Sequence, residues 1–361
     1  MNVFRKYLIF VFVTSISLYS VWTYTNPDLS VVEQKKASLA QPSLIIHSNG
    51  YDRGRGNIVG VQAFITGYEY LQEKYFFASM ESYIEEAIAR KFLQEDTLLV
   101  YPEHIGTPLF LLEEKKSILK HTSLEDATRY AFWSNPLRFV GEIFSLSRPK
   151  EIPIIKYWFT AKAEKMRDVY FHTFSTLASM YKTPILAGSI LLPKPSLRDG
   201  KLVLGAGELE NVSVLFGKDG NAKSLFFKNK LALPERRIAI SKKEDQIVET
   251  NSSLGQFAVF LSHDSLYTTH YQKITRETNI LLSPACLWSF QSISWQNEGF
   301  ISDKQTNTTA NIPDIVQNSK QLKNWMQFSL ADKIRITKAK YGLQVFLQGK
   351  LFGLRFQGYS Y

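Results

Sequence analysis

The sequence predicts an α/β fold, with helices covering sheets, behind one apolar N-terminal segment. Runs rich in β-branched and aromatic residues alternate with helix-periodic runs along most of the 361 residues. A hairpin signal, Gly217-Lys218-Asp219-Gly220, lies near the middle of the chain and adds antiparallel pairing. Hydrophobic residues make up 45% and charged residues 21% of the chain, so most of it can bury a core. These observations predict a layered α/β or α+β domain.

The N-terminus has the pattern of an exported or membrane-anchored protein. Arg5 and Lys6 precede an apolar run over residues 7–24, and a charged stretch before an apolar one is typical of export signals. No small-x-small cleavage site follows directly, so residues 1–24 are expected to be a signal anchor, with a cleaved signal peptide as the alternative. The positive residues should stay cytoplasmic, which places the folded part on the extracytoplasmic side. The polar residues 25–55 read as a linker.

The expected elements of the folded part, residues 56–361, follow in order. Apolar positions at helical spacing predict two long helices, one through Ile84, Ala87, Ile88 and Phe92 and one through Phe171, Phe174, Leu177 and Tyr181. Buried-strand patterns cover residues 57–65, 97–101, 185–189, 257–261, 280–282 and 343–347, and two more strands surround the hairpin turn.

Charge and cysteine content exclude several kinds of function. The formal net charge is +10, but the basic clusters are only pairs such as Arg236-Arg237, so nucleic acid is not expected as a partner. Cys286 is the single cysteine, which excludes an intramolecular disulfide and a zinc site built on several cysteines. No histidine and aspartate spacing is typical of zinc ligands. We expect no cofactor and no metal.

Three segments, in this order, carry a resemblance to a known family. They are Leu98-Leu99-Val100-Tyr101-Pro102-Glu103, Phe226-Phe227-Lys228-Asn229-Lys230-Leu231 and the run from Gly255 to Asp264 that contains Leu261-Ser262-His263. Together they resemble the carbon–nitrogen hydrolase (nitrilase) superfamily over residues 56–361. The resemblance implies a four-layer αββα sandwich, and often a homodimer that buries the helical face.

The resemblance also implies a catalytic site that acts on a small amide or acyl substrate. Glu103 would be the general base and Lys228 would stabilise the tetrahedral intermediate, while Ser262 stands where the family has its cysteine nucleophile. A Glu-Lys-Cys site attacks an amide or nitrile carbon and forms a covalent acyl intermediate, which water or another acceptor then releases.

A hydroxyl at position 262 changes the energetics of this chemistry. An alkoxide is much harder to form than a thiolate, and each unit of pKa mismatch adds about 1.4 kcal/mol to the barrier. Two interpretations remain open. Either Ser262 is a working nucleophile assisted by Lys228, or the domain has lost catalysis and serves as a nitrilase-fold binding or structural protein at the membrane.

Three auxiliary residues have both a functional and a structural interpretation. Glu235 stands where many family members have a second glutamate, which would orient Lys228, or it is a surface acid. Cys286 follows the strand beside Ser262 and would offer a displaced thiol, but a buried core cysteine is the commoner case. His263, like His104, flanks the expected cleft and is more often a hydrogen-bonded structural group than a metal ligand.

Residues 110–160 read as an insertion that is rich in aromatic and basic side chains. A lid over the cleft and an element lying on the membrane are two interpretations of this mixture. A packed helical excursion is the third. Aromatic members include Tyr130, Phe132, Trp133, Phe139, Phe144, Tyr157, Trp158 and Phe159, and basic members include Arg129, Arg138, Arg148, Lys150 and Lys156.

Overall fold

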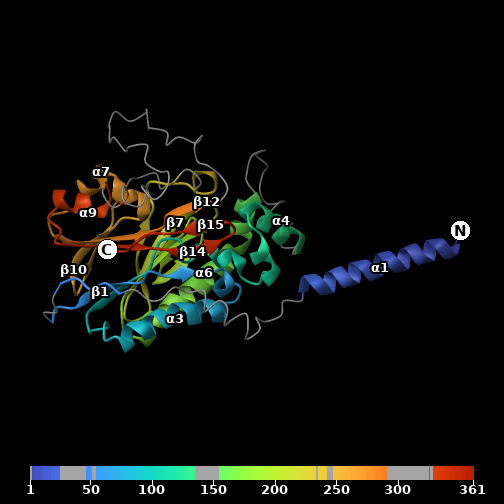
Figure 1. The fold of residues 1–361 in the computed structure, drawn as a ribbon, viewed down its shortest axis with the longest axis horizontal. Helices are drawn as coiled ribbons and strands as arrows, with labels where there is room; N and C mark the ends of the chain where they lie inside the picture. The colour runs from blue at the N-terminus through green and yellow to red at the C-terminus, as the bar shows by residue number, and fades with distance from the viewer. Residues whose placement is uncertain are drawn as a thin grey trace, which may run out of the picture.

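A long N-terminal helix projects from a folded body in the computed structural model (Figure 1). The structure describes residues 2–24, 46–50, 54–134, 154–232, 235–241, 247–290, 325 and 328–361. The N-terminal helix α1 (Asn2–Tyr24) coincides with the predicted apolar segment. Most of the predicted linker, and residues 135–153 of the predicted insertion, lie outside the described residues.

The first sheet of the body has five strands in the order β1-β3-β4-β7-β8. Strands β1, β3 and β4 run parallel, while β7 and β8 add antiparallel pairing around the predicted hairpin turn. Their bounds are β1 (Asn57–Gly60), β3 (Thr97–Val100), β4 (Ile185–Pro193), β7 (Leu209–Phe216) and β8 (Ala222–Phe227).

The second sheet has four strands in the order β13-β11-β10-β9. Parallel pairing joins β13, β11 and β10, and β9 is antiparallel at the edge. Their bounds are β9 (Glu249–Ser252), β10 (Gly255–Val259), β11 (Thr278–Ala285) and β13 (Tyr341–Phe346). A third sheet, in the order β12-β15-β14-β2, and a small β5-β6 hairpin complete the strands: β2 (Phe64–Ile65), β5 (Ser196–Arg198), β6 (Lys201–Val203), β12 (Trp288–Phe290), β14 (Gln348–Leu351) and β15 (Leu354–Phe356).

Two long helices cover the first sheet. Helix α3 (Glu73–Ala89) buries Phe76, Met80, Ile84 and Ala87 at helical spacing, and α6 (Ile154–Met180) runs beside it. The remaining helices are α4 (Leu124–Ser134), α7 (Thr268–Tyr271) and α9 (Leu330–Lys333). Short 3-10 turns are η1 (Tyr68–Tyr70), η2 (Thr107–Leu111), η3 (Lys116–Lys120), η4 (Glu235–Arg237), η5 (Ser262–Leu266) and η7 (Ile334–Ile336).

Three hydrophobic clusters separate four layers, with α3 on one side of the body and α7 and α9 on the other (Figure 1). Between the helices and the first sheet, Phe174 of α6 packs edge to face on Tyr101. Between the two sheets, Phe226 of β8 packs on Phe257 of β10. Tyr271 of α7 joins the cluster that covers the outer face of the second sheet. The predicted αββα sandwich is confirmed.

Two local predictions differ from the structure. The run 57–65 is not one strand, because β1 ends at Gly60 in the first sheet while β2 pairs with β14 in the third. The first long helix ends at Ala89, so Phe92 lies beyond it, and Ile88 is 45% exposed rather than on the buried face. Met80 and Phe76, one and two turns before Ile84, complete the buried stripe instead.

Candidate functional site

Three predicted residues lie just beyond the ends of three strands. Glu103 follows β3, Lys228 follows β8, and Ser262 follows β10 at the start of η5. Each is 0–2% exposed. Lys228 Nζ lies 2.8 Å from Glu103 Oε1, so the base and lysine positions are in direct contact. Two buried charges this close stabilise one another in a low dielectric, which repays part of the cost of taking both out of water.

Glu235 is the second partner of the lysine, as the resemblance implied. Its Oε2 lies 2.6 Å from Lys228 Nζ and accepts a hydrogen bond from the Ala232 amide at 2.7 Å. Burial lowers the pKa of Lys228, but the Glu103 and Glu235 carboxylates outweigh it and hold the pKa above its usual range. Burial likewise raises the pKa of Glu235, yet Lys228 and His104 together hold it well below its usual range. The lysine is therefore a fixed cation between two carboxylates.

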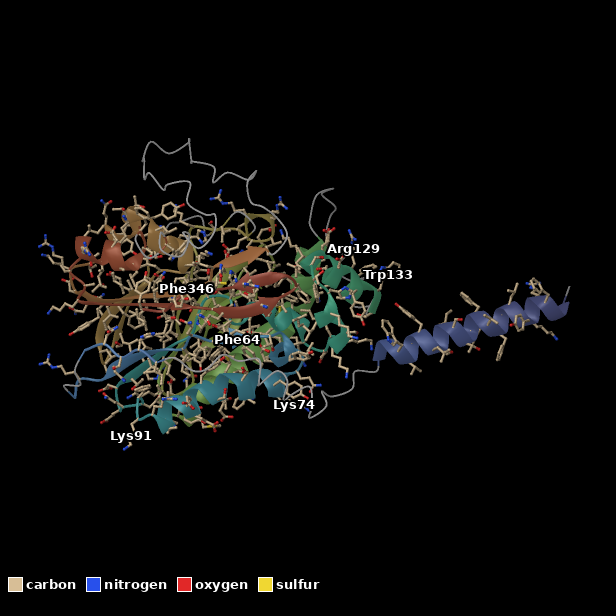
Figure 2. All side chains as sticks on the ribbon, in the orientation of Figure 1. Phe64, Lys74, Lys91, Arg129, Trp133 and Phe346 are labelled. Atoms are coloured by element: carbon tan, nitrogen blue, oxygen red, sulfur yellow. The ribbon has the colours of Figure 1, made fainter. Side chains whose placement is uncertain are left out.

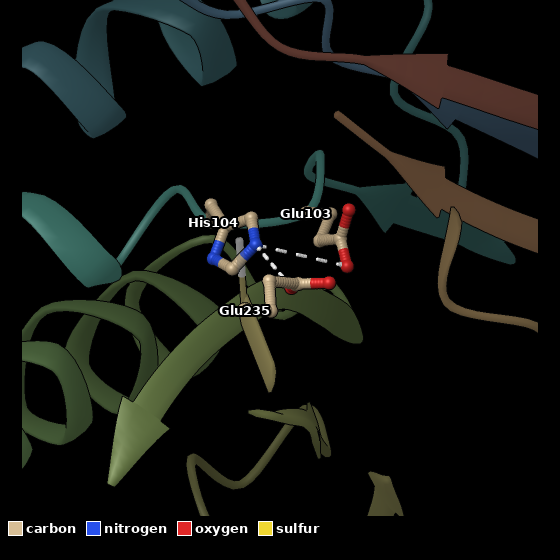
Figure 3. A group of neighbouring side chains, drawn as sticks. All are labelled: Glu103, His104 and Glu235. Atoms are coloured by element: carbon tan, nitrogen blue, oxygen red, sulfur yellow. Dashed lines mark hydrogen bonds and ion pairs between the residues drawn. The ribbon is translucent and has the colours of Figure 1, made fainter. Parts of the chain in front are cut away.

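His104 and Asn211 complete the polar cluster around the carboxylates. His104 Nε2 lies 2.9 Å from Glu235 Oε1 and 3.9 Å from Glu103 Oε1 (Figure 3). Asn211 Nδ2 donates to Glu103 Oε1 at 3.1 Å and to Glu235 Oε1 at 3.3 Å. Among the described residues, no hydrogen-bond donor contacts Glu103 Oε2, although this atom is buried. One oxygen of Glu103 is thus fully held, and the other is an open acceptor.

Ser262 sits on a strained turn between β10 and η5. Its φ is +47°, a left-handed conformation that costs a non-glycine residue free energy and is concentrated at functional sites. The hydroxyl donates to the Cys286 carbonyl at 3.4 Å, while Ser265 Oγ donates to the Ser262 carbonyl at 2.6 Å. His104 is also left-handed, at φ +60°. The turn directs the Ser262 hydroxyl at the Cys286 carbonyl in this conformation.

Asp264 joins the serine turn to the lysine loop. Its carboxyl accepts hydrogen bonds from the Asn229 amide at 3.1 Å and from the Lys230 amide at 2.7 Å. Burial raises the pKa of Asp264 to about 8, against the lowering effect of these two amides and of Lys228. Sequence reasoning quoted Asp264 in a motif but missed this role. An aspartate two residues after Ser262, at the end of an apolar strand, was the sequence feature that could have indicated it.

His263 and Cys286 line the cluster without taking a charged form. Burial and the neighbouring Lys228 lower the pKa of His263 to about 3, and its ring packs edge to face on Trp325. Burial and the Glu103 charge raise the pKa of the Cys286 thiol well above its usual range. A neutral imidazole and a protonated thiol leave the candidate general base and cation roles to Glu103 and Lys228.

The cluster fits an ammonium group better than a metal ion. Ligand atoms of Glu103, His104 and Glu235 lie within 4.8 Å of one another, which is close enough to bind a cation. Lys228 Nζ already contacts both carboxylates, at 2.8 and 2.6 Å. A divalent ion beside this ammonium would be repelled at close range.

No family model and no curated protein matches the sequence. Solved structures that match include an amidase of the nitrilase superfamily from Nesterenkonia, at 12% identity and a TM-score of 0.44, covering 84% of this chain and 80% of that chain. Another is a carbon–nitrogen hydrolase from Helicobacter pylori, at 14% identity and a TM-score of 0.46, covering 84% and 79%.

A double mutant of the Nesterenkonia amidase in complex with acrylamide matches at 12% identity and a TM-score of 0.46, covering 86% of this chain and 84% of that chain. Because these similarities are low, any chemistry of this chain is inferred from the contacts inside it.

Proposed function

We propose that this chain cleaves or transfers the acyl group of an amide, with Ser262 as nucleophile, Glu103 as general base and Lys228 as oxyanion stabiliser. The observation that carries the proposal is the open Oε2 of Glu103, a buried acceptor without a donor among the described residues. Leaving a buried acceptor unsatisfied costs about 1–3 kcal/mol. Such a cost is expected where a reacting group supplies the hydrogen.

The reaction has two balanced halves. Ser262 Oγ attacks the amide carbon, its proton passes to Glu103, and the Lys228 ammonium stabilises the oxyanion. The C–N bond then breaks, the amine leaves with the proton from Glu103, and the acyl group remains on Ser262 as an ester. Water or another nucleophile, deprotonated by Glu103, then attacks the ester carbon. The acyl–Oγ bond breaks, the acyl group leaves as the acid or the transfer product, and Ser262 takes back the proton from Glu103.

The membrane location that we propose for this chemistry is supported by α1. Among the described helices, α1 has the one window that passes as a membrane span, Phe4–Trp22, and none of it is buried in the body. Nineteen residues extend about 28 Å at about 1.5 Å per residue, close to the roughly 30 Å hydrocarbon core. We propose that α1 is a signal anchor with Arg5 and Lys6 in the cytoplasm and the body on the other side.

A second candidate function, a binding or structural role without catalysis, is favoured by a different observation. The Ser262 hydroxyl donates to the Cys286 carbonyl, so in this conformation its proton is directed at that carbonyl. In a domain that has lost catalysis, this bond would be the permanent state of the serine. The cluster of Glu103, Lys228 and Glu235 would then recognise a polar ligand or hold the fold together.

A fluorophosphonate probe separates the two candidates, because it forms a covalent bond only with an activated hydroxyl. We expect labelling of the full chain, loss of labelling in Ser262→Ala, and unchanged labelling in Ser82→Ala, which alters an exposed serine of α3. Intact-mass measurement of the modified peptide identifies the site. Labelling that persists in Ser262→Ala would overturn the assignment of the nucleophile.

The second candidate function is tested by Ser262→Cys, which supplies a thiol nucleophile instead of removing the hydroxyl. A thiol at position 262 would need no alkoxide, so Ser262→Cys should hydrolyse simple carboxamides if the rest of the site is competent. No labelling of the native chain together with no amidase activity in Ser262→Cys would reject catalysis and leave the binding function.

A further inference from the structure

The C-terminal end of α1 is attached to one corner of the body. Lys115 Nζ donates a hydrogen bond to the Trp22 carbonyl and lies 4.8 Å from the centre of the Trp22 ring. The Trp22 ring also packs edge to face on Tyr130 of α4, with centroids 6.3 Å apart. One turn earlier in α1, the Tyr19 hydroxyl donates to the carbonyl of Trp133. These contacts fix the end of the helix against the segment that runs from Lys115 to the end of α4.

Trp133 is the exposed tip of this corner. It lies in the last turn of α4 with 67% of its surface exposed, and Figure 2 shows it at the edge of the body nearest α1. Other large side chains of the predicted insertion behave differently: Trp158 and Phe159 are buried against Phe110, at centroid distances of 4.5 and 4.9 Å. Core packing explains Trp158 and Phe159, but it does not explain an exposed tryptophan next to the proposed membrane helix.

The height of Trp133 relative to the bilayer follows from its contact with Tyr19. Tyr19 precedes Trp22 by three residues, which is about 4.5 Å along the helix axis. Both residues belong to the apolar window that ends at Trp22. A body segment bonded at the level of Tyr19 therefore lies about one helical turn inside the end of the span, at the boundary between the lipid headgroups and the acyl chains.

We propose that the C-terminal end of α4, with Trp133 at its tip, lies in the interfacial layer of the bilayer that α1 crosses, where the lipid headgroups meet the acyl chains. We expect lipid on this surface because the surface is continuous with α1, which contacts this corner of the body. Tryptophan suits this layer, since its ring is apolar and its N–H finds polar partners there. The inference rests on the membrane anchor proposed above and adds a second, peripheral attachment of the body.

Site-specific fluorescence tests the inference in the full chain. The single native cysteine, Cys286, is buried and is replaced by alanine. Trp133→Cys, Phe10→Cys and Ile88→Cys each receive an environment-sensitive label, and the protein is placed in phosphatidylethanolamine–phosphatidylglycerol vesicles. Ile88 is the matched control, an exposed apolar side chain three residues before Lys91, which Figure 2 shows at the opposite end of the body.

Quenching by brominated lipid and by aqueous iodide gives the result. We expect at least a twofold loss of fluorescence with brominated lipid at positions 10 and 133, and none at position 88. A label at position 133 that is as open to iodide as the label at position 88, with position 10 still quenched by lipid, overturns the docking and leaves the anchor standing. Absence of lipid quenching at position 10 rejects the anchor, and the docking with it.

Discussion

At the scale of single residues, Lys228 decides how the candidate site is charged. One ammonium faces two buried carboxylates, so Lys228 offsets the charge of one carboxylate and the trio keeps one excess negative charge. His104 contacts Glu235 and is the most exposed member, with 14% of its side chain in solvent. Solvent therefore reaches the cluster at the Glu235 side, while Glu103 and its open oxygen are fully enclosed. Such enclosure would strengthen the proposed action of Lys228 on a developing oxyanion.

Asp264 should make the folded state less stable as the pH rises. Its pKa is about 8 when folded and close to 3.8 when unfolded, so between these values the unfolded chain releases a proton that the folded chain keeps. Stability then falls with increasing pH, by up to several kcal/mol at about 1.4 kcal/mol per unit. Asp264→Asn removes this titration and keeps an oxygen acceptor for the loop amides. In urea unfolding of the detergent-solubilised chain, the free energy of unfolding of the variant relative to the native chain should be higher at pH 8 than at pH 5.

Asp219 supplies the matched control for this experiment. It is an exposed aspartate whose pKa is lowered to about 2, chiefly by a hydrogen bond from Lys223. Its titration lies below pH 4 in both states, so Asp219→Asn should change stability equally at pH 5 and pH 8. An identical pH slope in Asp264→Asn and the native chain would contradict the raised pKa.

The sequence and the resemblance indicated the candidate residues and the pairing of Glu235 with Lys228, but the other partners at the site could not be predicted. Glu103 and Lys228 stand at strand ends in recognisable segments, and the structure brings them into contact. Asn211 and His104 depend on pairings between segments about a hundred residues apart, for which no local pattern exists. The direction of the Ser262 hydroxyl likewise depends on Cys286, which a distant strand supplies.

At the scale of elements, the β4 strand controls the position of Glu103 through Gly188. Gly188 has φ +65°, and a Cβ there would lie 2.1 Å from the Pro102 carbonyl oxygen. Gly188→Ala should therefore push the segment that carries Glu103 and destabilise the fold by more than about 2 kcal/mol. The midpoint of urea unfolding measures the loss.

Gly255, at the start of β10, serves as a control that separates the effect of the Cβ contact at Gly188 from the effect of a positive φ. Its φ is +115°, but a Cβ there would meet nothing closer than 3.6 Å. Gly255→Ala introduces strain of the same kind without the contact, so it should destabilise the chain less than Gly188→Ala. Equal losses in the two variants would show that the Pro102 carbonyl is free to move.

Elements with strong local patterns were the predictable ones. The parallel strands β3, β4, β10 and β11 are apolar runs that the sequence marks clearly, and they fall where expected. The third sheet was not predicted as a unit, because it pairs the two-residue strand β2 with the C-terminal hairpin. Strands that short carry no periodicity, and only the tertiary arrangement defines them.

At the scale of the whole molecule, α1 should determine where the chain resides. A charge in the middle of a spanning helix costs about 2.5–3.5 kcal/mol on insertion scales. Val13→Arg should therefore shift a large fraction of the chain from the membrane fraction, while Val13→Leu should leave it there. Carbonate extraction of membranes from expressing cells measures the fraction. Equal retention of both variants would contradict insertion of α1.

The layer order of the molecule could be predicted only through the resemblance. Alternating strands and helices are compatible with many α/β arrangements, and nothing local distinguishes two stacked sheets from one. In the structure, the two sheets stack because side chains such as Phe226 and Phe257 pack against each other between them. The corner that joins α1 to α4 was also outside sequence reasoning, which placed Trp133 in an insertion with three open interpretations.

The oxygen at position 262 has a consequence for chemical durability. A reactive cysteine beside a base is converted by peroxide to a sulfenic acid and then irreversibly to a sulfinic acid. A serine has no such oxidation states, and the one thiol of the chain, Cys286, is buried and protonated. A domain that faces away from the reducing cytoplasm would therefore keep its site intact under oxidants that would inactivate a thiol nucleophile, with no reductase needed to restore it.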